Sequence, residues 1–435
     1  MYHQRFFSDG SPRPATSPHL SRLNSSSTSH RTSTSLGMAR MIPLDTSLHL
    51  DVDTPKSQSI PSSPRSFCPT SARNLERYPS TPLSTSPSNK TKVLVTVNLP
   101  RSVIHHLRTS CPGAEIICIN HTLASSDREK ELNRLAVGSN IIIGLAHSCP
   151  YPVLLNALPT LQLFQSPYAG VDDLIQLLSP FPEIPLANNH GNCAAVAEHA
   201  IAMLYALHFR LLHYHSAMLR GEWLEVSSPG VDEQGPSPHN VPLSRSKVGV
   251  LGYGFIGRRV VDLLKALGSE VSICKKTSRV GPHCNEQVYT IDRLDEFLTE
   301  VDSIVVCLPL TNDTRHLIGR RHCRLLSGGC IVNVSRGEVF QEEPLFEALQ
   351  SGLLSGFASD VFWKENDPQS LDPNDDDAKF PFSFPFHTLS NVLMSPHRAD
   401  SPAMDVSYFK DVVSNINAVK EDCEFINFID RSKGY

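Results

Sequence analysis

The chain has 435 residues, and because 41 of the first 90 are Ser, Thr or Pro, two folded domains fit better than the usual estimate of about three. The formal net charge is −5; residues 1–90 carry ten Lys or Arg against five Asp or Glu, so the remainder carries −10, which gives no bulk attraction to nucleic acid or anionic membranes. Eleven cysteines without a Cys-x-x-Cys pair argue against a zinc ribbon and a disulfide scaffold, and favour a reducing, intracellular compartment.

Residues 1–90 form a Ser/Thr/Pro-rich tail that we expect to be disordered, because such a segment buries too little apolar surface to offset its ordering entropy. Its first 40 residues hold five Arg and one acid, Asp9, a composition typical of plastid or mitochondrial transit peptides. A plain extension of a soluble cytoplasmic protein has the same composition, so both interpretations stay open.

The folded pattern begins near residue 91. Short β-branched or apolar runs predict strands at 92–97, 116–119, 140–143 and 161–164, and a charged stretch predicts a helix at 125–136. Strands that alternate with helices are typical of a parallel sheet covered by helices on both faces.

A long helix is predicted at about 194–220. Its most apolar part, 194–212, contains Glu198, His199, His208 and Arg210, so we expect no membrane span there. After a Pro/Ser/Gly-rich insertion at 227–246, strands are predicted at 247–251, 270–273, 302–307, 329–334 and 356–359, with helices at 256–267 and 402–421. Two doubly wound units in sequence explain this alternation better than one large sheet.

A glycine-rich turn links the predicted strand 247–251 to the helix 256–267. Gly252, Gly254 and Gly257 form the pattern G-x-G-x-x-G. The first glycine permits a tight turn, the second lets backbone amides approach a pyrophosphate, and the third lets the helix pack closely on the strand. The pattern therefore predicts a dinucleotide site at the start of this helix.

The next predicted strand ends in residues that bear on the choice of cofactor. An NAD site usually has an Asp or Glu about 20 residues after the first glycine, to bind the ribose 2′-hydroxyl. Residues 274–279 hold no carboxylate and instead contain Lys275, Lys276 and Arg279 with two hydroxyls. We therefore expect NAD(P) as cofactor and hypothesise a preference for NADPH, while a solvated basic turn on an NAD protein is the alternative.

Three polar motifs, which we expect to lie at strand ends of the second unit, contain Arg336, Glu365 and His397. Ligands of open α/β sheets bind outside the carboxyl ends of the strands, so the three side chains are expected to meet. Arg336 would bind a carboxylate through a planar, bidentate contact, and His397 would donate a proton to a carbonyl oxygen that is reduced by hydride. Glu365 would fix the tautomer of the imidazole and raise its pKa.

Over roughly 92–435 the chain resembles the D-isomer-specific 2-hydroxyacid dehydrogenase family, which includes glyoxylate and hydroxypyruvate reductases. The motifs that carry the resemblance are Ala169-Gly170-Val171-Asp172, Val196-Ala197-Glu198-His199, the glycine turn, Leu308-Pro309-Leu310-Thr311 with Thr314, and the segments around Arg336, Asp360 to Glu365 and Pro396-His397.

The resemblance implies an α/β fold of two doubly wound parallel-sheet domains. A Rossmann cofactor domain at 191–397 would be inserted into a flavodoxin-like substrate domain formed by 91–190 and 398–435. The active site would lie in the cleft, and the long helix would form a homodimer.

The resemblance also implies roles for particular residues. Arg336, Glu365 and His397 would be catalytic, and Asp360 would bond the nicotinamide carboxamide. The backbone of Tyr168, Ala169 and Gly170 would bind a small 2-oxo acid, and we expect no metal. The remaining residues implied to bind the cofactor are Gly252, Gly254, Phe255, Ile256, Gly257, Lys275, Lys276, Leu308, Pro309 and Thr314.

The chain departs from the family pattern at three places, one of which is the unusual length of the insertion 227–246. Asn366 stands where a Pro normally follows the Glu, and an acidic, Pro- and Phe-rich loop occupies 366–390. An NAD(P)H-sensing scaffold or co-repressor on the same fold is an alternative, since a Ser/Pro-rich tail suits protein partnership. A weaker one is a fold that binds nucleotide without catalysis.

Overall fold

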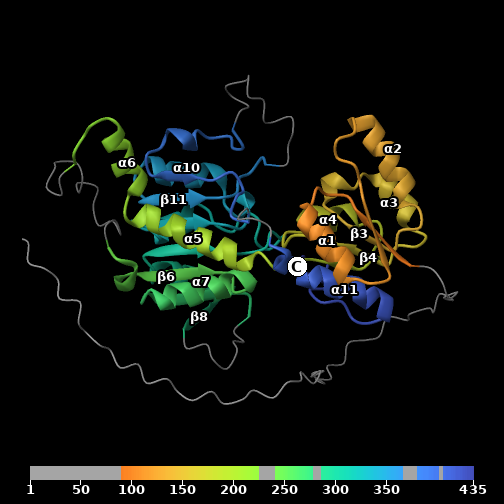
Figure 1. Ribbon diagram of the computed structural model, residues 1–435. Helices are drawn as coiled ribbons and strands as arrows, with labels where there is room; N and C mark the ends of the chain where they lie inside the picture. The colour runs from red at the N-terminus through yellow and green to blue at the C-terminus, as the bar shows by residue number, and fades with distance from the viewer. Residues whose placement is uncertain (1–89, 225–240, 278–285, 366–379, 401–404) are drawn as a thin grey trace, which may run out of the picture. The chain divides into compact units, whose positions relative to one another are not determined.

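The computed structural model describes residues 90–224, 241–277, 286–365, 380–400 and 405–435 (Figure 1), all of which belong to one compact unit, Leu83–Tyr435. The predicted tail up to residue 89, residues 227–240 of the predicted insertion, Arg279 and residues 366–379 lie outside the described residues. The predictions made for those segments therefore stay untested.

The first sheet of the described residues is parallel, with the strand order β2-β1-β3-β4-β5. This is the 2-1-3-4-5 order of flavodoxin-like folds. In the register, Val93 lies opposite Ile116 on one side and Ile141 on the other. The strands are β1 (Thr91–Val95), β2 (Ala114–Cys118), β3 (Ile141–Ile143), β4 (Leu163–Gln165) and β5 (Leu186–Ala187).

The second sheet is also parallel, with the strand order β12-β11-β10-β9-β6-β7-β8. From its far end this is the Rossmann order 3-2-1-4-5-6 with one further strand. Strands β7 and β8 lie on one side of β6, and β9 to β12 lie on the other, so the strand order reverses at β6. The carboxyl end of β6 carries the glycine turn. The strands are β6 (Lys247–Leu251), β7 (Glu270–Lys275), β8 (Gln287–Thr290), β9 (Ser303–Val306), β10 (Cys330–Asn333), β11 (Gly356–Ser359) and β12 (Val392–Met394).

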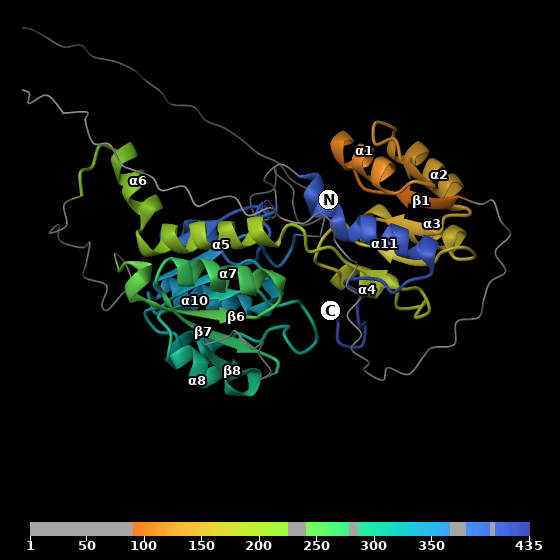
Figure 2. The ribbon, with the colours of Figure 1, turned by 60° about the horizontal axis from the view of Figure 1, so that its bottom comes forward.

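Helices cover both faces of each sheet (Figure 2). The α-helices are α1 (Arg101–Ser110), α2 (Ser125–Ala136), α3 (Tyr151–Ala157), α4 (Asp172–Leu177), α5 (Cys193–His208), α6 (Leu211–Leu219), α7 (Phe255–Ala266), α8 (Leu294–Thr299), α9 (Arg320–Leu325), α10 (Glu342–Gln350) and α11 (Lys410–Glu421).

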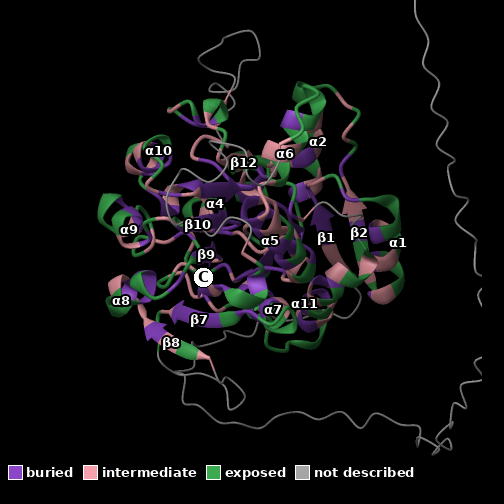
Figure 3. Cartoon of the chain, turned by 90° about the vertical axis from the view of Figure 1, so that its left-hand side faces the viewer, coloured by how far each residue is buried: buried purple, intermediate pink, exposed green. Residues whose placement is uncertain are grey.

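The cores lie between the sheets and these helices, and the central strands are buried on both faces (Figure 3). In β1, Leu94 packs toward α2, α3 and α4, whereas its neighbours Val93 and Val95 pack toward α1 and α11. The second sheet is covered by α5 and α7 on one face and by α8, α9 and α10 on the other. Successive strand residues point to opposite faces, so both must be apolar. The predicted doubly wound α/β class is confirmed, while the predicted domain boundaries stay predictions.

Two predicted helices are wrong in extent. The helix expected at 194–220 is divided into α5 and α6, which are bent by 62° at the break. Arg210 there has a left-handed backbone (φ 47°), which cannot continue a right-handed helix. Of the helix expected at 402–421, residues 402–404 lie outside the described residues. Within the described part, α11 begins only at Lys410, because the Asp405 carboxylate accepts a hydrogen bond from the Ser407 amide and starts a short 3-10 turn first.

Across the described residues, each helix taken alone is too short or too polar to cross a membrane; α5 and α6 reach the needed length and hydropathy only as a bent pair.

Candidate active site

The glycine turn joins β6 to α7, as predicted. Gly252 has a φ of +102°, and a Cβ there would lie 2.7 Å from the Cys307 carbonyl oxygen. A Cβ on Gly257 would lie 2.0 Å from the Gly252 carbonyl oxygen, so the start of α7 packs directly on the turn. At Gly254, by contrast, a Cβ would meet nothing within 4 Å. A ligand can therefore approach the backbone closely at Gly254, which lies at the N-terminus of the 12-residue helix α7.

The end of β7 is basic in the structure as well. The Lys275 ammonium lies 5.7 Å from the centre of the Tyr253 ring, and Arg258 lies 5.6 Å from the same ring. Lys276 forms an exposed ion pair with Asp313 at 3.1 Å. Lys275 and Lys276 stand at the end of β7, the strand next to the glycine turn, and Arg258 belongs to the first turn of α7.

Arg336 follows β10 and is held at both ends of its guanidinium. Nη1 donates to the Ser335 carbonyl at 2.9 Å, and Nη2 donates to Asp172 Oδ1 at 3.0 Å. A Cβ on Gly170 would lie 1.8 Å from Arg336 Nη2, so the backbone of Gly170 borders the guanidinium. The contact joins the start of α4 to the end of β10, which are 164 residues apart.

His397 and Glu365 form the second part of the site. The His397 Nδ1 lies 2.7 Å from Glu365 Oε2, and this hydrogen bond raises the pKa of the imidazole above its ordinary value, against the opposing effect of burial. The other carboxylate oxygen of Glu365 accepts a hydrogen bond from the Phe362 amide. Because Nδ1 is bound to Glu365, Nε2 is the ring nitrogen of His397 that can contact a ligand.

Asp360 holds the segment that carries His397. Its carboxylate is buried and accepts hydrogen bonds from the amides of Arg398 at 2.7 Å and Ala399 at 2.9 Å. Its carbonyl accepts from the His397 amide at 2.8 Å. His397 has a left-handed backbone (φ 52°), which costs a non-glycine residue of order 1–3 kcal/mol and needs such support. The predicted role of Asp360 toward nicotinamide stays a prediction.

Carbonyl groups of the predicted substrate loop, residues 168–171, are bound inside the protein. Asn188 Nδ2 donates to the Ala169 carbonyl at 2.7 Å, and Ser166 Oγ donates to the Tyr168 carbonyl at 2.8 Å. The described residues offer no acceptor to the amides of Ala169 and Gly170, which are therefore available to a ligand carboxylate.

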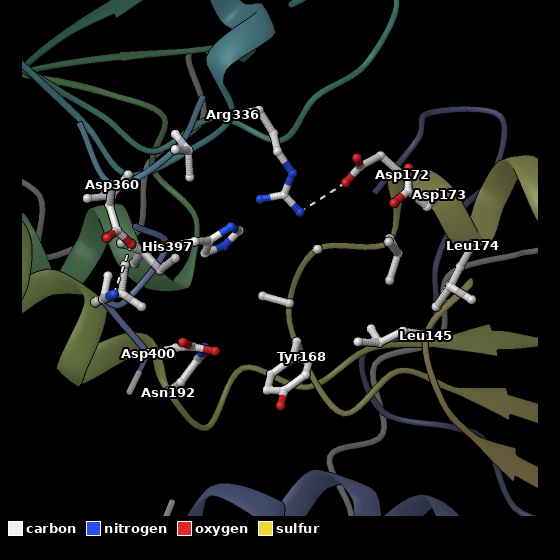
Figure 4. Close-up of a pocket in the computed structure, with 18 of the residues that line it drawn as sticks. Leu145, Tyr168, Asp172, Asp173, Leu174, Asn192, Arg336, Asp360, His397 and Asp400 are labelled. Atoms are coloured by element: carbon white, nitrogen blue, oxygen red, sulfur yellow. Dashed lines mark hydrogen bonds and ion pairs between the residues drawn. The ribbon is translucent and has the colours of Figure 1, made fainter. Parts of the chain in front are cut away.

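Two cavities adjoin in this region and share Gly170, Ile256 and Arg336 in their walls. The first, of about 370 Å³, also contains Tyr168 and His397 (Figure 4). The second, of about 410 Å³, contains the predicted cofactor residues Gly254, Phe255, Leu308 and Pro309.

Several predicted residues stand outside both walls. Glu365 lies behind His397, and Thr314 holds its own loop by donating to the Pro309 carbonyl at 2.7 Å. The other predicted residues absent from both walls are Gly252, Gly257, Lys275 and Lys276.

Sequence reasoning missed some residues that the structure brings to the site. Asp172 was recognised as part of a motif but not as the partner of Arg336, and Asp173, Asn188 and Asp400 were not singled out. Of these residues, Asn188 could have been found from the sequence, because the polar pair Asn188-Asn189 comes directly after β5. Within the described ranges, no group of three or more His, Cys, Asp or Glu is arranged to hold a metal ion.

Known proteins resemble this chain in sequence. Residues 201–399 match the NAD binding domain model of the D-isomer specific 2-hydroxyacid dehydrogenases. A glyoxylate reductase of Aeropyrum pernix is 30% identical over 253 residues, which cover 57% of this chain and 70% of that protein. A glyoxylate reductase of Thermococcus gammatolerans is 29% identical over 212 residues, covering 47% of this chain. The chain matches little more than half (56%) of that relative's length.

Solved structures share the fold. The NADPH-dependent glyoxylate/hydroxypyruvate reductase of Sinorhizobium meliloti aligns with a TM-score of 0.62 and 25% identity, covering 80% of this chain and 100% of that one. A 2-hydroxyacid dehydrogenase of Xanthobacter autotrophicus aligns over the same shares with a TM-score of 0.64 and 22% identity. Since the sheet orders, the glycine turn and the sequence matches agree, the chain belongs to the D-isomer specific 2-hydroxyacid dehydrogenase family.

Proposed function

We propose that this protein is an NAD(P)-dependent reductase of small 2-oxo acids that forms D-2-hydroxy acids. The observation that carries the proposal is one cavity whose wall holds Arg336 and His397, with Glu365 hydrogen-bonded behind the imidazole at 2.7 Å. The relatives that are named glyoxylate reductases support this reaction class.

The residues around the glycine turn fit a dinucleotide. Gly254 leaves open the space that a Cβ would fill, and Gly252 and Gly257 keep the turn tight against β9 and α7. Gly254, Phe255 and Ile256 would hold the pyrophosphate through the first amides of α7, and Leu308 and Pro309 would border the nicotinamide end. When bound in reduced form, the cofactor supplies the hydride.

The chain's own residues supply binding and the proton. Arg336, with the amides of Ala169 and Gly170, binds the substrate carboxylate and polarises the neighbouring carbonyl. Protonated His397 donates from Nε2 to the carbonyl oxygen as it becomes a hydroxyl. Glu365 keeps the proton on Nδ1 and stabilises the imidazolium.

The test is a panel of 2-oxo acids that includes glyoxylate and hydroxypyruvate, assayed with both NADH and NADPH. We expect turnover that falls at least about 1,000-fold in His397→Ala, because general acid catalysis is lost. The proposal would be contradicted if no 2-oxo acid were turned over, or if turnover survived His397→Ala. Absence of turnover in a protein that still binds the cofactor would favour the scaffold alternative.

The preference for NADPH is part of the proposal. It is supported by Lys275 and Arg258 beside the Tyr253 ring, and by the lack of a carboxylate among the described residues 274–277. Cations suit the 2′-phosphate of NADPH by charge-assisted hydrogen bonds. We expect kcat/KM to be at least about tenfold higher with NADPH than with NADH; a tenfold preference for NADH would end this part of the proposal.

We also propose a homodimer that uses the helix pair α5 and α6. The proposal is supported by large apolar side chains that α6 and the residues after it leave exposed. Leu219 is 75% exposed and Trp223 is 77% exposed. Exposed apolar clusters of this kind mark protein interfaces.

A further inference from the structure

We propose that the cavity at Arg336 selects 2-oxo acids that carry a single negative charge and rejects those with a second anionic group at the far end. The inference rests on the proposed function, because it concerns the substrate of the same site. The charge selection depends on the carboxylates of the cavity wall, whereas the proposed reaction depends on the proton donor His397.

The wall of this cavity holds more carboxylates than the reaction needs. Asp172 and Asp173 begin α4, and Asp400 lies three residues after His397. Figure 4 shows the first two on one side of the cavity and Asp400 on the other. A fourth carboxylate, Asp360, is occupied by the backbone amides of Arg398 and Ala399.

The cations of the wall are few and already engaged. Arg336 is the sole permanent cation among the lining residues, and it shares its Nη2 group with Asp172 at 3.0 Å. His397 also lines the wall, and in the proposed reaction its proton is directed to the carbonyl oxygen. Once the carboxylate of the substrate binds Arg336 and its carbonyl oxygen takes the proton of His397, a second anion has no other permanent cation among the described lining residues and lies near Asp173 or Asp400.

The pKa values of two of these carboxylates are raised chiefly by burial, and a neighbouring carboxylate adds to the effect in each case. Burial, with Asp172 adding to it, raises the pKa of Asp173. Burial also raises the pKa of Asp400, with Asp360 adding to the effect and His397 opposing it. The smaller contributions of Asp172 and Asp360 have the sign of like-charge repulsion, and an additional anion at the same place would be opposed in the same way.

The rest of the wall suits a short neutral group. Leu145, Ala146 and Leu174 are apolar, and Tyr168 adds an aromatic ring. A hydrogen, methyl, ethyl or hydroxymethyl group on the 2-oxo acid finds apolar contact there and hydrogen-bond acceptors in the carboxylates.

The experiment compares 2-oxobutanoate with oxaloacetate, which differ by a methyl group against a carboxylate. Binding of each to the full chain with NADP⁺ is measured by calorimetry, so that no turnover is needed, and kcat/KM is measured with NADPH. We expect 2-oxobutanoate to be favoured by at least about 100-fold, the effect of one like-charge contact at roughly 6 Å in a protein environment.

Two variants change the charge of the wall without changing its shape. Asp173→Asn and Asp400→Asn should each lower the ratio of the two acids' affinities, and of their kcat/KM values, about tenfold. The reason is that removing a negative charge helps oxaloacetate to bind more than it helps 2-oxobutanoate. Asp127→Asn removes the same charge from the exposed start of α2, away from the cavity, and should leave the ratio unchanged. Measuring a ratio separates charge selection from a general loss of binding.

A wild-type ratio near one would overturn the inference, and so would a ratio that neither cavity variant moves. If the binding ratio behaves as expected while no 2-oxo acid is turned over, the charge selection stands and the proposed reductase function fails. If glyoxylate is turned over in a His397-dependent way and the ratio is near one, the function stands and the selection fails.

Discussion

The hydrogen bond between Glu365 and His397 sets the protonation state of the proposed acid. It raises the pKa of His397, so the imidazole stays protonated to a higher pH than a free histidine does. Activity in the reductive direction should therefore persist above pH 6.5 and be lost as the pH rises through the raised pKa. In Glu365→Gln the alkaline limb of the pH profile of kcat/KM should move to lower pH, by about one unit or more.

The direction of the shift identifies the cause. A purely structural role for Glu365 would lower kcat/KM at every pH and leave the limb in place. Glu338→Gln serves as the control, because that side chain pairs with Arg315 outside the cavity walls.

Two glycines of the same turn should respond differently to a methyl group. Gly257→Ala places a Cβ 2.0 Å from the Gly252 carbonyl oxygen, so we expect a loss of stability of about 1–3 kcal/mol, seen as a lower Tm. Gly254→Ala meets no protein atom within 4 Å and has a negative φ of −83°, so its Tm should be unchanged. Its Kd for NADPH should instead rise at least about tenfold, because the methyl occupies space where backbone approaches the phosphates. Equal cofactor affinity in Gly254→Ala and wild type would argue against a dinucleotide at this turn.

At the scale of elements, the sequence was informative where a strand is a long apolar run. The run around β6 and the glycines after it predicted the cofactor turn. By contrast, β5 has only two residues, and β8 and β12 are partly exposed strands without a continuous buried run, so these three were missed. The break between α5 and α6 was missed because apolar residues continue on both sides of Arg210. Backbone geometry at one residue ends the helix, and hydrophobic periodicity does not report it.

The residues of the candidate site also fall into those that the local sequence predicts and those that it does not. Arg336, Glu365 and His397 could be predicted because each follows a strand and carries its own local motif. The pairing of Arg336 with Asp172 could not, since it joins segments 164 residues apart and depends on the three-dimensional fold. Asp400 was also missed, because nothing in its local sequence tells that its carboxylate reaches the cavity.

The packing of α11 on the first sheet depends on one buried amide. Asn415 donates to Gln165 Oε1 in β4 at 2.8 Å and accepts from the Ile426 amide at 2.8 Å. Asn415→Leu should lower the free energy of unfolding by about 2–4 kcal/mol, because Gln165 and Ile426 lose buried partners. Asn417→Ala, which loses only a 3.4 Å contact to Ser110, should cost less than about 1 kcal/mol. Urea unfolding of both variants measures the difference, and equal losses would contradict this account of how α11 is held.

At the scale of the whole molecule, the apolar side chains of α6 bear on the proposed assembly. The residues before α6 bury their apolar side chains against the second sheet, but α6 itself buries only Ala217 among the described residues. Leu211, Leu212, Met218 and Leu219 are left exposed along nine residues. A helix with this composition gains stability only when another surface covers it, and a second copy of the chain presents the same apolar residues.

The dimer can be weakened by a single charge on α6. In a two-fold interface each substitution counts twice, so Leu219→Glu should raise the dimer dissociation constant by at least about 100-fold, given roughly 1.5–3 kcal/mol for each buried leucine. Light scattering after gel filtration should then find the mass of two chains for wild type and of one chain for the variant. Leu155→Glu makes the same change at an exposed position on α3 and should remain dimeric. A wild-type protein that elutes as one chain at micromolar concentration would contradict the proposed dimer. A dimer that Leu219→Glu does not weaken would place the interface elsewhere, since α6 could not then lie between the two copies.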